Sequence, residues 1–277
     1  MKRTLILFAT AISLSVMAAP KKKQPLPAVE QSTVVVDQTA QQVVHDNNAD
    51  SVHSMASITK LMTAMVVLDQ TYNLDREITL KQPYYGKRIY TVKELLDLTL
   101  IRSDNHAAEI LSKSFHGGRD EFIEAMNRKA WSLNMLSARF ADPTGLSADN
   151  SATAKDIAKM VAAAGQYPDI RRSTQKTVEV NTQQGRKIKT VSINNTNKDI
   201  LSEFDNILVS KTGTTSRAGK CLAMLVEKAG HVYAVVILGE PSKVRRDQQA
   251  KNLLQNHLVV SNEFRIGYDK DSHSRYN

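Results

Sequence analysis

The chain has 277 residues, of which 42% are hydrophobic, and its formal net charge is +9 at pH 7. This length is enough for one sizeable domain, or two closely packed lobes, with a substantial core. Aromatic residues make up only 5% of the chain and no basic helix stands out, which argues against a nucleic-acid-binding protein. The basic balance instead suits an anionic wall polymer or membrane surface.

The N-terminal segment has the pattern of a secretory signal. A positive start is followed by an apolar run from Leu5 to Val16 and by small residues before Pro20. The run is short for a bilayer span, and the small residues favour a cleaved signal over an uncleaved anchor. We therefore expect residues 1–19 to be a signal peptide. The protein would then be periplasmic, soluble or loosely associated with the wall or membrane, and without a transmembrane anchor. Removal of residues 1–19 would lower its formal net charge by two, from +9 to +7.

The first half of the chain predicts a short hairpin followed by helices. Residues 20–31 are polar, contain three prolines and show no periodicity, so we expect a flexible leader. Two strands follow, over residues 33–37 and 41–45. Beyond Ser57 the pattern becomes helical, which predicts a helical lobe over about residues 58–165. Its further signals are a capping box at Thr91-Val92-Lys93-Glu94, helical patterns over 106–115, 120–133 and 154–165, and a turn-rich loop over 140–146.

From residue 177 onward the period of the pattern becomes two. It predicts a hairpin over residues 178–193, three strands over 206–210, 221–226 and 232–238, and a last helix over 247–259. The fold class is therefore α/β (α+β), an antiparallel sheet flanked by helices whose first and last parts pair, with an all-helical lobe inserted. We expect one domain over residues 32–260 with a polar tail over 261–277, and a site in the cleft between the lobes.

The cysteine and histidine residues do not indicate a disulfide or a metal site. Cys221 is the only cysteine, so an internal disulfide is impossible, and its apolar surroundings indicate packing. The seven histidines are scattered, without a His-Glu-x-x-His motif or a close pair suited to a metal. A zinc peptidase is thereby excluded, and we expect no metal and no cofactor.

Ser57 and Lys60 form the first candidate catalytic pair. They lie three residues apart at the start of an apolar run, so a helix would put both side chains on one face. Free N–H groups at a helix N-terminus favour developing negative charge, which makes Ser57 a candidate nucleophile. Burial would make Lys60 a base, although lowering its pKa from about 10.4 to about 7.5 costs roughly 4 kcal/mol. The spacing alone is weak, because an N-cap serine and an edge lysine also produce it, and Ser173 and Lys176 repeat it within polar, β-like sequence.

Two further motifs fit the same kind of site. Ser103-Asp104-Asn105 lies between two helical patterns, where a loop can present side chains to a cleft. The similar triplets at 132–134 and 192–194 instead end a helix and lie in a strand-like stretch. Lys211-Thr212-Gly213 occurs once, at the end of the strand over 206–210. An edge strand with a lysine, a hydroxyl and a glycine suits a peptide that lies alongside it and ends in a carboxylate.

The ordered triple Ser57-x-x-Lys60, Ser103-Asp104-Asn105 and Lys211-Thr212-Gly213 resembles the signature of penicillin-binding proteins and class A β-lactamases. The segments ASITKLMTAMVVLD, DPTGLS, TNKDI and SKTGTTSRAGKCLAM resemble the low-molecular-mass penicillin-binding proteins, in particular their D-alanyl-D-alanine endopeptidases. The resemblance covers nearly all of the chain after residue 19. It implies a penicillin-binding/β-lactamase-like transpeptidase fold and a penicillin-sensitive serine peptidase that acts on peptidoglycan.

The resemblance also implies roles for the residues of the first two motifs. Ser57 would be the nucleophile that forms the acyl-enzyme, and Lys60 the base that takes its proton. Ser103 would relay a proton toward the leaving amine, and Asn105 would hold the amide of the substrate. The partners implied are peptide stems and cross-links of peptidoglycan, with β-lactams as covalent inhibitors.

For the third motif, the resemblance implies that Lys211 supports the electrostatics and contacts substrate, while Thr212 and Thr214 bind the terminal carboxylate. The backbone N–H groups of Ser57 and Thr214 would form an oxyanion hole, a contact worth about 3–4 kcal/mol in the transition state. The middle motif departs from the pattern. Glycine or glutamate is expected between its serine and asparagine in these peptidases, whereas Asp104 resembles the lactamase form.

Three alternatives stay open. A class A β-lactamase needs a glutamate in a Glu-x-x-x-Asn loop, and no glutamate occurs between Ala141 and Arg172, which argues against efficient lactam hydrolysis. A D-alanyl-D-alanine carboxypeptidase is the runner-up. It is less favoured because membrane-attached carboxypeptidases carry a second β-rich domain and an amphipathic C-terminal helix, which the polar tail does not resemble. A non-catalytic wall-binding or penicillin-sensing protein on the same fold is the third. Endopeptidase cleavage of cross-links is the expected activity.

Overall fold

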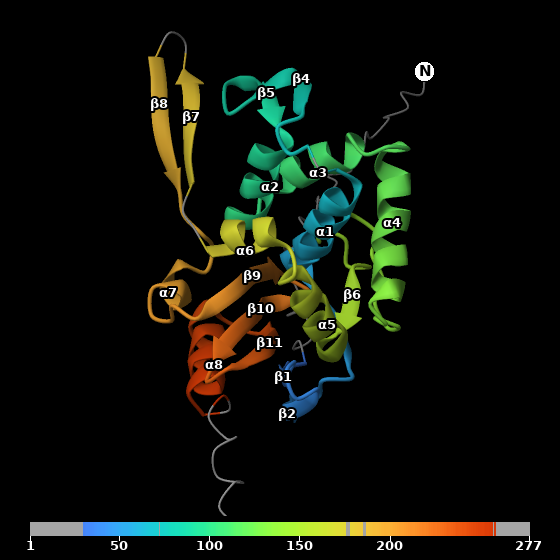
Figure 1. Cartoon of the computed structure of the whole chain (residues 1–277), viewed down its shortest axis with the longest axis vertical. Coiled ribbons are helices and arrows are strands. Elements are labelled where there is room, and N and C mark those ends of the chain that lie inside the picture. The colour runs from blue at the N-terminus through green and yellow to red at the C-terminus, as the bar shows by residue number, and fades with distance from the viewer. Residues whose placement is uncertain (1–29, 72, 176–177, 185–186, 257, 259–277) are drawn as a thin grey trace, which may run out of the picture.

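The computed structural model describes residues 30–71, 73–175, 178–184, 187–256 and 258, and Figure 1 shows their arrangement. The predicted signal peptide, residues 20–29 of the predicted leader and the predicted tail lie outside the described residues. Of the helices that are described, none is both long and apolar enough to cross a membrane.

A five-stranded antiparallel sheet, in the order β2-β1-β11-β10-β9, forms the lower part of the molecule in Figure 1. Its strands are β1 (Ser32–Asp37), β2 (Gln42–Asn47), β9 (Ile207–Thr215), β10 (Gly219–Lys228) and β11 (His231–Glu240). The first strand of the chain pairs with the last, with Val34 opposite Val236. The expected pairing of the two ends of the chain is therefore confirmed, and β9 lies at one edge of the sheet.

Both faces of this sheet are covered by helices. Alternate residues of a strand point to opposite faces, so the apolar runs of β10 and β11 supply two buried surfaces. One surface packs against helix α8 (Lys243–Asn256), in a cluster that includes Leu222, Met224, Val226, Leu253 and Leu254. The other packs against helices of the second lobe, in a cluster that includes Cys221, Ala223 and Leu225. The predicted packing role of Cys221 agrees with its complete burial.

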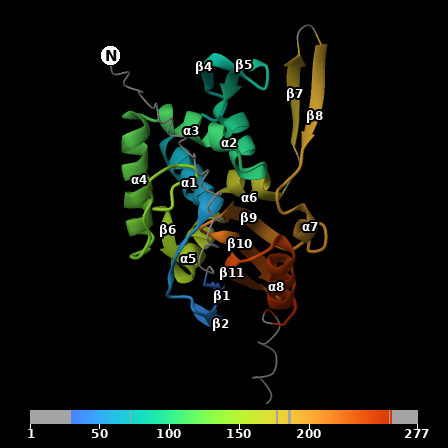
Figure 2. The same ribbon diagram turned by 180° about the vertical axis from the view of Figure 1, so that it is seen from behind.

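The second lobe is built around a central helix. Helix α1 (Lys60–Gln70) lies between α4 and α2 in both views (Figures 1 and 2). The helices around it are α2 (Val92–Ile101), α3 (Asn105–Lys113), α4 (Gly118–Ser132), α5 (Ala154–Ala164) and α6 (Pro168–Gln175). The predicted capping box is confirmed, because Thr91 Oγ1 accepts from the Glu94 N–H at 3.1 Å and the Thr91 N–H donates to the Glu94 carboxylate at 2.8 Å.

Smaller elements complete the fold. The predicted hairpin over 178–193 is confirmed as β7 (Val178–Gln184) and β8 (Lys187–Ile193), which extends away from the body in Figures 1 and 2. A short helix, α7 (Lys198–Leu201), leads from this hairpin toward β9. Strand β3 (Val52–Ser54) pairs with β6 (Ser151–Thr153) and ties the segment before Ser57 to the segment before α5.

One part of the stretch expected to be helical is a β-hairpin. Strand β4 (Glu77–Tyr84) pairs with β5 (Lys87–Thr91), between α1 and α2. In the first half of β4 the half-buried Ile78 and Leu80 alternate with exposed residues, and Tyr90 of β5 is buried. Tyr85 and Gly86 both have positive φ, at 48° and 75°, as a tight hairpin turn requires. The expectation of an all-helical lobe was therefore wrong over these two strands.

Two serines also lie in other settings than expected. Ser57 is not in the first turn of α1 but in a 3₁₀ turn, η1 (Ala56–Thr59), which ends where α1 begins at Lys60. Ser173 lies on helix α6 and not in β-like sequence, where it is buried and its hydroxyl donates to Asp97. Ser173 is therefore committed to packing α6 against α2.

The two lobes meet where η1 lies against β9. A Cβ atom at Gly213 would be 2.9 Å from the carbonyl oxygen of Met55 and 3.2 Å from the backbone nitrogen of Ser57. The glycine therefore lets the backbone of Ser57 approach the strand more closely than a side chain would allow.

Candidate active site

Lys60 lies at the centre of the candidate site, completely buried. Its Nζ is 3.0 Å from Ser57 Oγ, 2.7 Å from Asn105 Oδ1 and 2.5 Å from the carbonyl oxygen of Thr144. The carbonyl oxygens of Asn105 and Thr144 can only accept hydrogen bonds. In the neutral amine they take the two N–H groups, and the lone pair is left for the hydroxyl of Ser57.

Two buried lysines share the site, which disfavours a positive charge on both. Burial lowers the pKa of Lys60 to about 7, while the carboxylates of Asp142 and Asp104 act in the opposite direction. Burial also holds the pKa of Lys211 well below its usual range, and the positive charges of Lys60 and Arg246 add to this effect. The arrangement therefore supplies a neutral amine as a base near neutral pH.

The loop before β6 fixes the carbonyl that Lys60 contacts. The carboxylate of Asp142 accepts from the backbone N–H groups of Thr144 at 2.6 Å, Gly145 at 2.7 Å and Ser147 at 2.6 Å. Asn150 holds the loop from the other side, since its Nδ2 donates to the carbonyl of Asp142 at 2.8 Å. Sequence reasoning identified this loop only as rich in turns. A carbonyl acceptor such as that of Thr144 has no side-chain signature that could have revealed it.

Lys211 connects the edge strand to the loop of the middle motif. Its Nζ donates to Ser103 Oγ at 2.8 Å and to the carbonyl of Thr212 at 2.9 Å. The hydroxyl of Thr212 in turn donates to Thr196 Oγ1 at 2.7 Å. Ser103 itself has φ +63°, which is rare for a residue other than glycine and is found where the surroundings hold the backbone in place.

Asp104, the unexpected residue of the middle motif, is fully engaged. One of its carboxylate oxygens caps α3 by accepting from the Ala107 N–H at 3.0 Å. The other accepts from the hydroxyls of Tyr84, with which it makes a short contact, and of Tyr85, at 3.3 Å. Burial and the contact with this carboxylate raise the pKa of Tyr84, so the phenol stays a donor. The tip of the β4–β5 hairpin thus holds the loop that carries Ser103.

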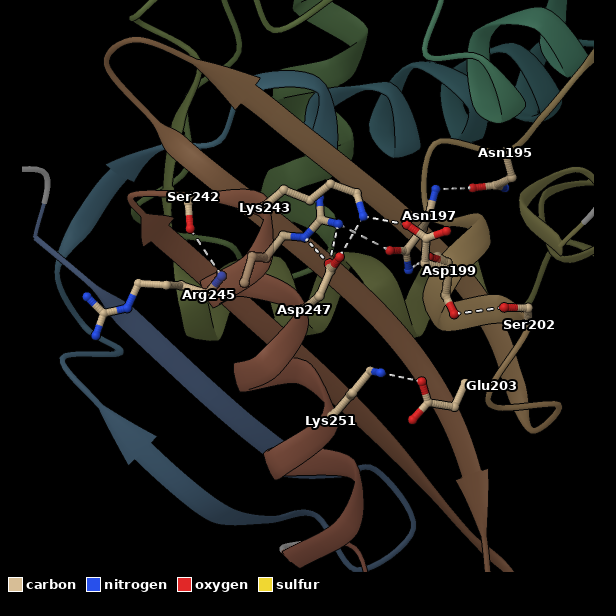
Figure 3. A network of polar contacts seen from close by, with 12 residues as sticks. Asn195, Asn197, Asp199, Ser202, Glu203, Ser242, Lys243, Arg245, Asp247 and Lys251 are labelled. Atoms are coloured by element: carbon tan, nitrogen blue, oxygen red, sulfur yellow. Dashed lines mark hydrogen bonds and ion pairs between the residues drawn. The ribbon is translucent and has the colours of Figure 1, made fainter.

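A cavity of about 310 Å³ opens beside the candidate nucleophile. Its walls are formed by Ser57, Ser103, Thr196, Thr212, Gly213, Thr214, Lys220, Lys243 and Arg246. Figure 3 shows Lys243 directed toward Asp199 and Asp247, at 2.5 Å and 2.7 Å. Arg246 is nearly buried and also pairs with Asp247, so both cations are fixed in position. Because these two cations are paired with carboxylates, Lys220 and the hydroxyl groups of the wall are the groups that suit the carboxylate of a peptide.

The residues of the three predicted motifs converge. Ser57, Ser103, Thr212 and Thr214 line the cavity. Lys60 is hydrogen-bonded to Ser57 and Lys211 to Ser103, and Asn105 accepts a hydrogen bond from Lys60. The sequence did not indicate three further contributors, which are the Thr144 carbonyl, Tyr84 and Arg246. Among the described residues, no group of three or more His, Cys, Asp or Glu side chains could hold a metal ion.

The sequence of the chain is similar to those of known proteins. The sequence profile of a family described as D-alanyl-D-alanine carboxypeptidase matches residues 19–242. The D-alanyl-D-alanine endopeptidase of Pseudomonas aeruginosa is 35% identical over 238 residues, which are 79% of this chain and 75% of the relative. The D-alanyl-D-alanine endopeptidase of Escherichia coli is 34% identical over 267 residues, which are 89% and 86%.

Solved structures give the same fold. The chain matches penicillin-binding protein D2 of Listeria monocytogenes in its cefotaxime-bound form with a TM-score of 0.71 and 25% identity, over 84% of this chain and 98% of that one. It matches the Streptomyces K15 DD-transpeptidase with a TM-score of 0.74 and 24% identity, over 84% and 98%. The expected transpeptidase-like fold is therefore confirmed.

Proposed function

The chain belongs to the family of D-alanyl-D-alanine carboxypeptidases, and we propose that it is a serine-type DD-peptidase that hydrolyses D-alanyl-linked bonds of peptidoglycan through an acyl-enzyme. We propose cleavage of cross-links, the endopeptidase reaction of the penicillin-binding protein 7 type, as its main activity. The relatives with the higher identities, 35% and 34%, are named endopeptidases, which supports this choice over the carboxypeptidase.

One observation carries the proposal. Lys60 Nζ lies within 3.0 Å of three oxygens, two of which cannot donate, and the third is the hydroxyl of Ser57. A cap and an edge lysine, the structural alternative for this pair, would leave the lysine at the surface. Complete burial of Lys60 in a hydrogen-bonded position beside a cavity fits a general base instead.

In the proposed acylation step, Ser57 Oγ bonds to the carbonyl carbon of the D-alanyl residue while its proton moves to Lys60 Nζ. The backbone N–H groups of Ser57 and Thr214 stabilise the negative oxygen that forms. The carbon–nitrogen bond then breaks, and the proton held by Lys60 passes through Ser103, whose hydroxyl contacts Lys211, to the leaving amine. Lys60, neutral again, takes a proton from a water molecule whose oxygen bonds to the carbonyl carbon of the ester. As the ester bond to Ser57 breaks, Lys60 returns this proton to Ser57 Oγ, which restores the starting state.

Substrate positioning follows from the walls of the cavity. We propose that Asn105 Nδ2 contacts the amide of the substrate, since Asn105 Oδ1 is already used by Lys60. Thr212 and Thr214 would hold a carboxylate, with Lys220 as the cation of the same wall. Because the peptide would lie along β9, an edge strand, its backbone can also pair with the sheet.

We also propose an exported, periplasmic location and a single peptidase domain over residues 32–260. The secretory pattern of residues 1–19 supports export, and the shared core of the two lobes supports one domain. The peptide partners would then be the stems and cross-links of the cell wall, and β-lactams would acylate Ser57.

Digestion of purified cross-linked muropeptides, followed by mass measurement, tests the reaction. A dimer that is split into monomers supports the endopeptidase, and loss of a single alanine from a pentapeptide stem supports the carboxypeptidase instead. Ser57→Ala is the control and should abolish either product.

Labelling with a fluorescent penicillin separates the enzyme from a non-catalytic binding protein. Covalent label that disappears in Ser57→Ala supports the enzyme. Folded protein that takes up no label, and cleaves no peptide, would instead support a binding module.

A further inference from the structure

The loop between β8 and α7, residues 194–197, contacts both lobes at the candidate site. The Thr196 N–H donates to the carbonyl oxygen of Ile101 at 3.2 Å, at the end of α2 and two residues before Ser103. The Asn197 side chain donates to Ser210 Oγ of β9 at 2.8 Å. Thr196 itself lines the cavity beside the candidate nucleophile. The loop therefore brings a hydroxyl group to the cavity on a backbone that both lobes hold.

Buried amides and an ion pair keep this loop in place. Asn195 and Asn197 are both buried, and Asn195 Nδ2 donates to the carbonyl oxygen of Thr174 in α6 at 2.6 Å. Asn195 Oδ1 accepts from the Asn197 N–H at 2.8 Å, which closes a tight turn around the threonine between them. Figure 3 shows the next anchor, where Lys243 of α8 donates to Asp199 of α7 at 2.5 Å. The position of the threonine is therefore set by the protein itself.

The hydroxyl of Thr196 faces the hydroxyl of Thr212, which the proposed function assigns to the substrate carboxylate. The two Oγ1 atoms are 2.7 Å apart, and among the described residues Thr196 is the one side-chain partner of the Thr212 hydroxyl. Thr212 is only 7% exposed, so this hydroxyl has little access to bulk water. A hydroxyl has a single proton. Thr212 can therefore donate to Thr196 or to a carboxylate, but not to both.

The short distance between the two oxygens decides what happens when a carboxylate takes the Thr212 proton. Two hydroxyl oxygens lie 2.7 Å apart only when a proton lies between them, because that distance is the usual length of an O–H···O hydrogen bond. If the Thr212 proton turns toward the carboxylate, the proton between the two oxygens has to come from Thr196. Both protons reach these positions by rotation about a C–O bond, so the loop does not have to move.

We propose that Thr196 is a positioning residue that makes Thr212 the donor to the substrate carboxylate. With substrate bound, Thr196 Oγ1 donates to Thr212 Oγ1, and Thr212 Oγ1 donates to the carboxylate. A hydroxyl that accepts one hydrogen bond is a stronger donor in the next, and a carboxylate is a strong acceptor. No proton is transferred between the groups. This inference rests on the proposed function, which places a carboxylate at Thr212.

Two matched peptides test this role. One ends in D-alanyl-D-alanine and the other in D-alanyl-D-alaninamide, in which a neutral carboxamide replaces the terminal carboxylate. The measured quantity is the ratio of kcat/KM for the acid to kcat/KM for the amide. Thr196→Val keeps the shape of the side chain and removes its hydroxyl. This variant should lower the ratio about tenfold relative to the wild type, as expected for a weakened hydrogen bond to a charged group.

Further variants separate the hydroxyl from the rest of the side chain. Thr196→Ser keeps the hydroxyl and should restore the ratio to within twofold of the wild type. Thr196→Ala lacks the hydroxyl and has no branched side chain to disturb the turn, so it should repeat the loss seen in Thr196→Val. Thr71→Val, at the C-terminal end of α1, removes a threonine hydroxyl outside the walls of the cavity. It is the matched control and should keep the ratio of the wild type.

Three results would overturn the proposal. An unchanged ratio in Thr196→Val and Thr196→Ala would show that the hydroxyl does not act on the carboxylate. A higher ratio would show that Thr196 only accepts and competes with the carboxylate for the Thr212 proton. A ratio in Thr196→Ser as low as in Thr196→Ala would assign the effect to the methyl group.

Failure of the proposed function can be distinguished from failure of this inference. If the wild type cleaves neither peptide, the proposed function fails, and binding to Ser57→Ala protein then decides about Thr196 alone. The affinity of this protein for the acid relative to the amide should fall about tenfold when Thr196→Val is added. Equal relative affinities with and without Thr196→Val, or no binding of either peptide, would refute the role of Thr196.

Discussion

Replacing Lys60 by methionine tests whether this lysine is neutral in the folded protein, without any need for activity. The change keeps the length of the side chain and removes the ionisable group. The unfolded chain holds the proton up to a pKa of 10.5, whereas the folded protein releases it near pH 7. Between these values the unfolded state binds one more proton, so the free energy of unfolding of the wild type rises with pH.

The expected size of this effect follows from the two pKa values. A pKa of about 7 in place of 10.5 corresponds to about 5 kcal/mol, all of which opposes folding below pH 7 and is relieved as the pH rises. Lys60→Met removes this cost. The free energy of unfolding of the wild type, relative to the variant, should therefore rise by about 1.4 kcal/mol per pH unit, or about 3 kcal/mol between pH 7.5 and 9.5.

Denaturant unfolding of both proteins at several pH values measures the slope. Lys93→Met, at an exposed position of α2, is the control. The difference in unfolding free energy between this variant and the wild type should not change with pH, because both proteins contain Lys60. A difference between wild type and Lys60→Met that is constant from pH 7.5 to 9.5 would show that Lys60 keeps its proton, and it would remove the base from the proposed mechanism.

Three other predictions concern residues around the site. Tyr84→Phe removes a hydroxyl that donates to Asp104, so acylation by penicillin should slow about tenfold while thermal unfolding changes little. Gly145→Ala should lower the melting temperature strongly, because its Cβ would be 1.9 Å from a backbone carbonyl oxygen at φ +83°; Gly230→Ala, at φ +78° but in open space, should cost only about 1 kcal/mol. Burial raises the pKa of Cys221 to about 11, so a thiol reagent at pH 8 should modify it only in denaturant, and rapid modification of folded protein would contradict the buried position.

The main elements of the fold could be predicted because they are apolar runs with clear limits. The strands around Val34, Ala223 and Val236 are short continuous apolar runs and are buried on both faces, and the capping box at Thr91 marks the start of α2. The β4–β5 hairpin was missed because its few apolar residues show no sustained period of two and the segment lies between strongly helical patterns. The position of a segment between predicted helices therefore does not predict a helix where its own apolar residues lack a period of 3.6.

The side chains of the site could be predicted, but the backbone groups that contact them and the type of turn that carries Ser57 could not. Ser57, Ser103 and Lys211 belong to motifs that can be read from the sequence, since the chemistry needs those residue types. The carbonyl of Thr144 is supplied by the backbone, which every residue has, so no residue type indicates it. Ser57 was placed in the wrong kind of turn for a related reason, because a 3₁₀ turn and the first turn of an α-helix share the spacing of three residues.

The most direct test of the catalytic site is the rate of acylation by benzylpenicillin as a function of pH, for the wild type and for Lys60→Arg. With Lys60 as the base, the rate constant should rise about tenfold per pH unit below pH 7 and level off above it. Arginine keeps the charge but holds its proton, so Lys60→Arg should be acylated more slowly by orders of magnitude. A rate constant that is flat from pH 5 to 9, or near-normal acylation of Lys60→Arg, would contradict this assignment.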